Sequence, residues 1–471
     1  MEMTRDYLNE QLVSIIAPAG YGKTEEIANA VNFCSGRQLV LTHTRAGVAA
    51  LRARMEKRGI SNEQYEVDTI AAFSLKWCKA YPATARVKIP NNNSEINYVA
   101  IYNGARNIFE MNWAREVLRQ TYSGIFVDEY QDCTQSQHSI IMCLKGLIPI
   151  RLFGDPLQGI FYWVNEDKII NFNDFSIKTI TPLTYPWRWE ETNKRLGILL
   201  DNLRKKLLAT IEGNSVTINI SNVESCMSVV SSSIWNHGRY AYNIRGYDSI
   251  VYLASFEKKQ QSFSQHNGGY FQCDERKDLE EAERIIKRIQ TEKNEKRALV
   301  LLESLAYIIN GINAELGSYL RNLRNGNTDF SRIRKHKELG DLIKDVCNDN
   351  SMKPVLNVLR WFNTSNEFNI FRGKLFYKIG KIVAYMTDEN VTLHEAVEFL
   401  SGQRYFTEKN FGFSRLSSRT VLTKGLEFDC VIIDARDAMD ARDFYVAMTR
   451  AKKYIYIISD EKQLTFKGIT Y

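Results

Sequence analysis

The stretch Ala17-Pro18-Ala19-Gly20-Tyr21-Gly22-Lys23-Thr24 stands between a short apolar run, residues 12–17, and a segment of helical periodicity, residues 23–31. Glycines at positions 20 and 22 let backbone N–H groups turn inward around a phosphate. Lys23 would reach the β- and γ-phosphates of a nucleotide, and the Thr24 hydroxyl would bind Mg²⁺. A strand before the loop and a helix after it favour a phosphate-binding loop over a chance match, although Ala17 replaces the first glycine of the general pattern. The predicted nucleotide-binding residues of this loop are Ala19, Gly20, Gly22, Lys23 and Thr24.

On both sides of this loop, short apolar runs alternate with helical segments. This alternation predicts an α/β fold with a parallel, doubly wound sheet. The expected strands are residues 12–17, 38–42, 124–127, 150–153, 249–254, 430–434 and 454–459. Between about residues 274 and 400 the strand signals nearly vanish, and residues 278–293 and 298–323 have helical periodicity. We therefore expect a helical insertion within a second α/β domain.

A second chemical motif is the acidic segment that ends the apolar run at residues 125–127. Asp128 would hold Mg²⁺ through water, and Glu129 would orient and deprotonate the attacking water. A solvated acidic turn is the alternative interpretation. The phosphate-binding loop earlier in the chain favours the catalytic one, because nucleotide hydrolysis needs both parts.

Bulk composition is compatible with these motifs and adds little to them. The chain has 471 residues, of which 44% are hydrophobic and 25% charged, and its net charge is +7. This length predicts two to four domains, and the positive charge permits a polyanionic partner. The sequence contains no apolar run long enough for a membrane span. The N-terminus does not resemble a signal peptide, and the eight cysteines form no CxxC pair, so we expect a cytoplasmic protein with reduced thiols.

The segment Asp128-Glu129-Tyr130-Gln131-Asp132 resembles the signature of the UvrD/Rep branch of superfamily 1 helicases. Other segments resemble further motifs of that family in the expected order, namely residues 42–47, 51–54, 69–74, 154–163, 183–188, 423–429 and 445–451. The resemblance implies two RecA-like parallel-sheet domains of the P-loop NTPase fold. The first would span residues 1–180 with a small insertion at about 75–120. The second would span residues 181–273 and 405–471, with a helical subdomain at 274–404.

The resemblance also implies residue roles, with ATP and Mg²⁺ as cofactors. Gln158 would contact the γ-phosphate, and Arg188 and Arg450 would act as arginine fingers. Trp187 stands where the family places an adenine-stacking aromatic residue, and Glu427 matches a glutamate near the ribose. Cations placed across a domain cleft would neutralise charge that develops on the transferred phosphoryl group.

Single-stranded DNA is the partner that the resemblance implies. Phe161 and Trp163 follow the γ-phosphate contact closely, and exposed aromatics stack on bases without reading sequence. Packing in the core is the alternative for both. His43 stands where the family usually has phenylalanine, so it either stacks on a base or is a buried histidine bonded to backbone. The DNA-binding residues expected from the motifs are Thr42, His43, Thr44, Thr69, Phe161 and Trp163.

Some positions depart from the family pattern. The adenine-reading glutamine would fall at Glu2, and Gln11 lies too close to the loop to replace it. The histidine usual before the Lys424 motif is absent, with Val421 in that stretch, and Pro186 replaces an asparagine. The specificity for the nucleotide base is therefore open.

Both insertions are short for this family. In this respect the chain resembles the short UvrD-like proteins of prokaryotic anti-phage modules, such as the helicase subunit of Gabija systems. Two functions follow as expectations. The first is an ATP-dependent 3′–5′ single-stranded DNA translocase or helicase in DNA repair or anti-phage defence. The alternative is an ATPase switch that senses DNA or nucleotides and regulates a partner nuclease, such as one of the OLD type.

Overall fold

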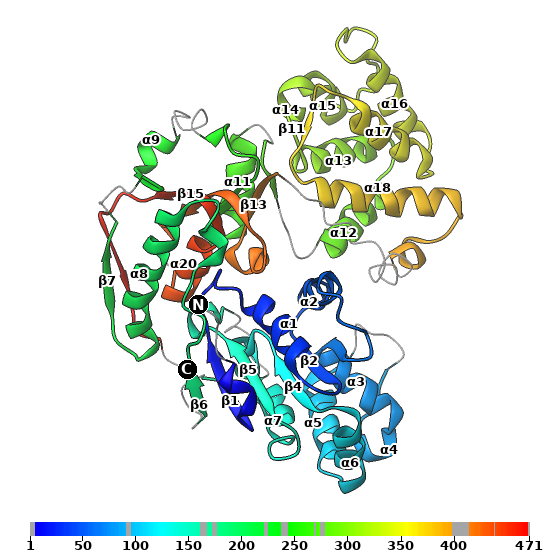
Figure 1. The fold of residues 1–471 in the computed structure, drawn as a ribbon. Helices are drawn as coiled ribbons and strands as arrows, with labels where there is room; N and C mark the ends of the chain where they lie inside the picture. The colour runs from blue at the N-terminus through cyan, green and yellow to red at the C-terminus, as the bar shows by residue number, and fades with distance from the viewer. Residues whose placement is uncertain are drawn as a thin grey trace. The chain divides into compact units, whose positions relative to one another are not determined.

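A computed structural model describes residues 5–90, 96–160, 167–171, 177–220, 225–236, 244–267, 270–273, 278–397, 414–437 and 439–469. The chain forms two compact units (Figure 1). The first comprises Met1–Arg239 and Thr423–Tyr471, and the second comprises Tyr240–Leu422. None of the described helices is both long enough and apolar enough to cross a membrane. The three domain ranges expected from the family resemblance stay a prediction.

The first sheet has the strand order β3-β2-β4-β5-β1-β6, and its pairings are parallel. Its strands are β1 (Leu12–Ile16), β2 (Gln38–Thr42), β3 (Tyr65–Thr69), β4 (Gly124–Val127), β5 (Ile150–Gly154) and β6 (Lys178–Ile180). Every residue of β2, β4 and β5 is buried, as expected for parallel strands that are covered on both faces. The carboxyl ends of parallel strands meet at one edge of the sheet, where α/β proteins bind their ligands.

Helices cover both faces of this sheet. On one face, α1 (Lys23–Phe33) and α2 (Arg45–Lys57) pack against alternate strand residues such as Val40 and Phe126. On the other face, α3 (Ile70–Ala80), α5 (Tyr98–Phe109), α6 (Asn112–Thr121) and α7 (Gln135–Met142) pack against the residues between them, such as Leu39 and Ile125. Helix α4 (Pro82–Ala85) lies in the same segment between β3 and β4. Because successive strand residues face opposite sides, one run of apolar residues supplies both cores.

The second sheet also has six strands, in the order β10-β13-β9-β14-β15-β8, and the pairings described for it are parallel. The first unit contributes β8 (Met227–Val230), β14 (Phe428–Asp434) and β15 (Ala451–Ile458). It also holds α8 (Lys194–Ile211), α9 (Ser232–Asn236), α20 (Ala441–Met448) and an antiparallel pair, β7 (Val216–Asn219) with β16 (Gln463–Phe466). The predicted α/β class with two parallel sheets is confirmed.

Of its described residues, the second unit contributes the other three strands of the second sheet and holds a helical block. The strands are β9 (Ile250–Leu253), β10 (Gln272–Cys273) and β13 (Arg415–Ser418), and α11 (Glu257–His266) follows β9. The block consists of α12 (Asp278–Thr291), α13 (Asn294–Ala306), α14 (Ile312–Glu315), α15 (Gly317–Arg324), α16 (Lys337–Asn348), α17 (Lys353–Thr364) and α18 (Gly373–Asp388). A two-residue pair, β11 (Ile309–Asn310) with β12 (Asn369–Ile370), interrupts it.

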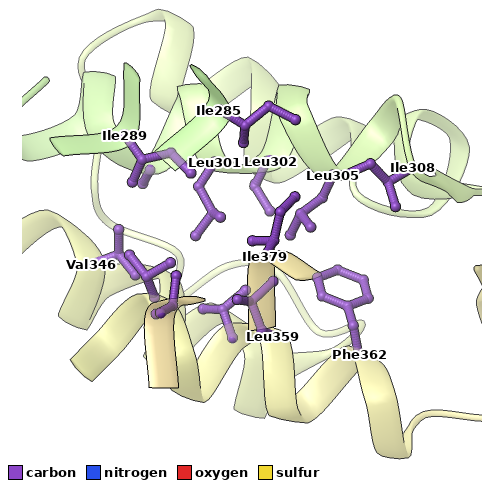
Figure 2. Close-up of a cluster of buried hydrophobic side chains, with 14 of the residues drawn as sticks. Ile285, Ile289, Leu301, Leu302, Leu305, Ile308, Val346, Leu359, Phe362 and Ile379 are labelled. Atoms are coloured by element: carbon purple, nitrogen blue, oxygen red, sulfur yellow. The ribbon is translucent and has the colours of Figure 1, made fainter. Parts of the chain in front are cut away.

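The helical block has its own apolar core. Figure 2 shows Ile285 and Ile289 of α12 and Leu301, Leu302 and Leu305 of α13 on one side of this core, with Val346, Leu359 and Phe362 of α16 and α17 on the other. The expected helix over residues 298–323 was wrong in one respect. The helix is interrupted between α13 and α14, where Gly311 has the left-handed φ of 92° and caps the start of α14. A continuous α-helix has no place for that conformation.

Candidate ATP-binding and hydrolysis site

The phosphate-binding loop leaves the end of β1. The Ala17 N–H donates to the Gly154 carbonyl at 3.1 Å, which ties the loop to the end of β5. Gly20 and Gly22 have φ of +77° and +83°, in the left-handed region that favours glycine. A Cβ atom at Gly20 would lie only 2.6 Å from the buried ring of Trp189, so both conformation and space require glycine at that position.

Lys23 and Thr24 form the first turn of α1, which begins after Gly22. Lys23 is buried, and its Nζ donates to the Ala17 carbonyl at 3.1 Å across the loop. Thr24 is half-buried beside it. Unpaired backbone N–H groups at a helix start, together with the positive end of the helix dipole, favour an anion here.

The carboxylates of Asp128 and Glu129 lie at the end of β4. Asp128 is buried, and its backbone N–H donates to the Leu41 carbonyl at 2.8 Å. Glu129 has φ of +55°, a strained backbone conformation for this residue type, and its N–H donates to Asp128 Oδ1 at 3.0 Å. Strain of this kind is found preferentially at functional sites.

The environments of these two carboxylates push their pKa values apart. Burial, and then the charge of Glu129, raise the pKa of Asp128. Burial also acts to raise the pKa of Glu129, but the cations Lys424 and Lys23 outweigh it and hold that pKa below its usual range. Glu129 is therefore the more readily ionised of the pair. The Gln131 amide donates to Glu129 Oε2 at 2.5 Å, and Gln131 Oε1 accepts the Asp155 N–H at 3.0 Å.

The segment after β5 carries Gln158 on a short 3-10 helix, η4 (Pro156–Gln158). Asp155, which has no exposed surface, accepts hydrogen bonds from Gln158 Nε2 at 3.0 Å and from Arg204 Nη2 at 3.0 Å. Lys424 Nζ donates to the Gln158 carbonyl at 2.7 Å and forms an ion pair with buried Asp132. The segment after β5 is thus held both by Arg204 and by Lys424.

The two predicted arginine fingers lie close to each other. Arg188 belongs to the 3-10 helix η5 (Trp187–Trp189), donates to the Thr449 carbonyl at 2.8 Å and pairs with Glu427 at 2.7 Å. Arg450 is buried, and its Nε and Nη1 donate to the carbonyls of Val446 and Leu426 at 3.0 and 3.3 Å. Burial, and then the positive charge of Arg188, lower the pKa of Arg450 to about 10, so it remains a cation at neutral pH.

Trp187 and Trp189, two residues apart, have opposite environments. Trp189 is buried and donates its Nε1–H to the Ala451 carbonyl at 2.8 Å. Trp187 is 63% exposed, with Tyr185 edge-on at 4.7 Å between ring centroids. A Cβ atom built at Gly22 would lie 3.6 Å from Trp187 Cδ1, so this indole lies beside the phosphate-binding loop. Glu427, also exposed, is held by Arg188.

The residues expected to contact DNA are mostly engaged with the protein itself. Thr42 is buried at the end of β2. The Thr44 hydroxyl caps α2 by accepting the Gly47 N–H at 3.0 Å, and the Thr69 hydroxyl caps α3 by accepting the Ala72 N–H at 3.0 Å. These caps stabilise the starts of the two helices.

His43 lies with its Nε2 3.4 Å from Cys133 Sγ. Burial, and then the charge of Lys424, lower the pKa of His43 to about 4. This imidazole is therefore neutral near pH 7. Phe161 and Trp163 lie outside the described residues.

Sequence reasoning missed four residues that hold the site in place. Gln131, Lys424 and Tyr445 stand inside recognised motifs, so their positions carried a signal although no role was assigned. Tyr445 is buried, and its hydroxyl accepts the Ala19 N–H at 3.3 Å. Arg204 lies in α8 among other basic residues and had no signal in the sequence.

A phosphate-binding loop, a carboxylate pair and two arginines beside parallel strands are the combination found in P-loop enzymes that hydrolyse ATP. Residues 91–178 match the UvrD/REP helicase N-terminal domain, and residues 422–458 match the UvrD-like helicase C-terminal domain. In both segments the chain is therefore similar to UvrD/Rep helicases, in agreement with the motifs and their order.

One relative is Gabija protein GajB of Bacillus cereus (strain VD045). It is 25% identical over 398 residues, which cover 78% of this chain and 72% of the relative.

Two solved structures are among those to which this chain is similar. An Arterivirus nonstructural protein 10 (helicase) in complex with DNA has a TM-score of 0.36 and 8% identity, over 97% of this chain and 62% of that one. A Pif1 helicase from Bacteroides in complex with ADP-AlF3 and single-stranded DNA has a TM-score of 0.30 and 13% identity, over 57% of each chain. The chain thus spans about three fifths of the length of these solved helicases.

Proposed function

We propose that the chain is an ATP-driven 3′–5′ translocase or helicase on single-stranded DNA that acts in anti-phage defence. The observation that carries the proposal is the convergence of Lys23, Asp128 and Gln158 at the carboxyl ends of β1, β4 and β5. These three adjacent parallel strands bring together a phosphate-binding cation, a metal-binding carboxylate and an amide. That combination is what phosphoryl transfer requires.

The residues around the loop fit a magnesium nucleotide. Magnesium prefers oxygen ligands and is usually held by one or two protein groups together with substrate phosphates. Thr24 and Asp128 supply such oxygens, and in the described part of the chain no cluster of three or more His, Cys, Asp or Glu could hold a metal alone. Bound there, the ion would neutralise phosphate charge. Lys23 and the N–H groups of Ala19, Gly20 and Gly22 bind the phosphates.

Glu129 acts as the base in this proposal. Its lowered pKa keeps the carboxylate ionised at neutral pH, and the Gln131 amide holds one of its oxygens. Glu129 orients the attacking water and takes its proton, while Gln158 contacts the γ-phosphate. Arg188 and Arg450 stabilise the charge that develops on the phosphoryl group.

Fewer residues are available to bind the nucleoside than to bind the phosphates. Trp187 offers an exposed ring beside the loop for stacking on the adenine, and Glu427 binds the ribose. Because Glu427 is paired with Arg188, nucleotide binding at Glu427 would also free the guanidinium to turn toward the phosphates. This exchange links occupancy of the site to placement of the finger.

Thr42, His43, Thr44, Thr69, Phe161 and Trp163 are the proposed DNA contacts. The similarity to Gabija protein GajB supports a role in defence. It also supports a second candidate function, an ATPase switch that senses DNA or nucleotides and regulates a partner nuclease, such as one of the OLD type. The short insertion of α4 to α6 favours this candidate, because larger insertions in this family help to engage duplex DNA.

Strand displacement by the purified chain separates the two candidates. Duplexes with a 3′ single-stranded tail, a 5′ tail or no tail are incubated with ATP, and Glu129→Gln serves as the inactive control. Unwinding only of the 3′-tailed duplex supports the motor. DNA-stimulated ATP hydrolysis without displacement or translocation on any substrate supports the switch. Hydrolysis by Glu129→Gln within a few-fold of the wild type would contradict the assignment of the base.

A further inference from the structure

A buried ion pair lies directly behind the proposed γ-phosphate contact. Asp155 has no exposed surface and follows the end of β5. One of its carboxylate oxygens, Oδ2, accepts the Gln158 amide at 3.0 Å, and the other, Oδ1, accepts Arg204 Nη2 at 3.0 Å. Arg204 Nε also approaches Oδ2 at 3.5 Å, so the guanidinium faces both oxygens. Arg204 belongs to no recognised nucleotide motif.

The carboxylate determines how the Gln158 amide is oriented. An ionised carboxylate only accepts hydrogen bonds, so it must face the amide nitrogen and not the amide oxygen. With one N–H committed to Asp155, the second N–H points elsewhere, and the carbonyl oxygen is placed on the opposite side. The second N–H suits a phosphate oxygen, whereas the carbonyl suits a proton of the attacking water. A reversed amide would offer neither group correctly.

Arg204 compensates for the burial of that carboxylate and fixes it in place. A carboxylate without exposed surface is strongly destabilised unless a cation and hydrogen bonds compensate for its lost hydration. Burial acts against the charge on Arg204 as well, but the charge of Asp155 outweighs it and raises the pKa of Arg204. Two-point contact between a guanidinium and a carboxylate also fixes the plane of the carboxylate.

The helix that carries Arg204 also contacts the phosphate-binding loop. Asp201, three residues earlier on the same face of α8, accepts the Tyr21 hydroxyl at 2.8 Å. The start of α8 is anchored by Asn193, whose amide donates to the Lys453 carbonyl at 2.8 Å. One helix therefore contacts both the loop that binds phosphate and Asp155, which holds the amide expected to sense it.

We propose that Arg204 is a positioning residue for ATP hydrolysis, which fixes Asp155 so that Asp155 holds the Gln158 amide in its productive orientation. This inference rests on the γ-phosphate contact proposed above for Gln158. In this proposal Arg204 acts through Asp155. Its removal should therefore impair the chemical step and leave nucleotide binding largely intact. Misplacement of a reacting group by about 1 Å can lower a rate about 100-fold.

The test compares Arg204→Met with Arg195→Met. Arg195 is an exposed arginine on the same helix, and its side chain donates to Ser225 Oγ at 3.0 Å. ATP hydrolysis is measured with saturating single-stranded DNA, and thermal unfolding is followed on the same samples. We expect Arg204→Met to lower kcat between about 10-fold and about 100-fold with KM within a few-fold of the wild type. Arg195→Met should behave as wild type.

Arg204→Lys keeps a cation beside Asp155 and remains informative if Arg204→Met does not fold. It offers one point of contact in place of two, so we expect wild-type thermal stability and an intermediate kcat. Equal kcat for Arg204→Lys, Arg195→Met and the wild type would overturn the proposal.

The same lysine change is then made in a Gln158→Ala background. If Arg204 acts through Gln158, the lysine change should have no further effect on kcat there. The same fold-loss in both backgrounds would show that Arg204 acts by another route and would overturn the inference. A normal kcat for Gln158→Ala alone would instead overturn the γ-phosphate contact, and with it that part of the proposed function.

Discussion

Replacement of Lys424 by methionine tests the buried ion pair that ties the end of β4 to the start of β14. Lys424 Nζ contacts Asp132 Oδ2, and both side chains are almost fully buried. The other oxygen, Asp132 Oδ1, is buried and has no hydrogen-bond partner in the described part of the chain. Methionine keeps the length of the side chain and removes its charge. It therefore leaves the buried Asp132 carboxylate without the cation that pairs with it.

The magnitude follows from that isolation. Removal of one partner from a buried ion pair destabilises a protein by about 3–5 kcal/mol. One kcal/mol shifts Tm by about 2–4 °C in a domain of about 150–250 residues. The first unit is somewhat larger, so the lower value of about 2 °C applies, and we expect Lys424→Met to lower its Tm by about 6–10 °C. The outcome should depend on pH, because the buried carboxyl can escape its charge by binding a proton.

The sign of this pH dependence follows from Asp132. Burial, partly offset by Lys424, raises its pKa from 3.8 to about 7. A raised pKa means that the folded protein binds more protons than the unfolded chain between these values, so stability falls as pH rises through about 7. Loss of Lys424 raises the pKa further. The Tm deficit of Lys424→Met should therefore be smaller at pH 6 than at pH 8.5.

Thermal unfolding of three variants at both pH values provides the assay. Lys453→Met is the matched control, because buried Asp429 keeps a second lysine, Lys452, at 3.1 Å when Lys453 is lost. That change should cost about 1 kcal/mol or less. Lys424→Met combined with Asp132→Asn should recover most of the lost Tm. A Tm for Lys424→Met equal to that of Lys453→Met, or no recovery in the double variant, would refute the reasoning.

Three further predictions concern the nucleotide site and its surroundings. Arg188→Ala should lower kcat by about 10³-fold with a smaller change in KM, and a normal kcat would make its pair with Glu427 merely structural. For His43, a folded pKa of about 4 against about 6.5 in the unfolded chain means that stability is lost as pH falls through this window. His43→Gln should remove about 1–2 kcal/mol of that loss between pH 7 and pH 5, and parallel Tm profiles for variant and wild type would contradict it. Gly20→Ala should lower Tm more than Gly22→Ala, because both changes strain the backbone but only the Gly20 change clashes with the buried indole of Trp189. Equal Tm values for the two variants would show that the ring moves aside.

The fold could be predicted where the sequence itself reports burial. Strands β2 and β4 match the expected ranges because every residue in them is buried, and the sequence shows this as a short apolar run at residues 39–41 in β2 and 125–127 in β4. Strand β3 was missed because its residues Tyr-Glu-Val-Asp-Thr alternate between buried and half-buried positions. An alternating strand at the edge of a sheet resembles a polar loop in composition. The break at Gly311 was missed for a related reason, since the apolar periodicity continues on both sides of it.

The sequence predicts where the candidate site residues lie more readily than it predicts which side chains contact them. The order of strands and motifs implies that Lys23, Asp128 and Gln158 follow parallel strands, and the topology of the sheet then brings them to one edge. Nothing in a linear pattern says which distant arginine faces Asp155, because that contact depends on how α8 packs in the folded unit. In the folded protein, buried polar groups identify these partners. A carboxylate without exposed surface must have a partner, so Asp155 leads to Arg204 and Asp132 leads to Lys424, two residues that the motifs alone left without a role.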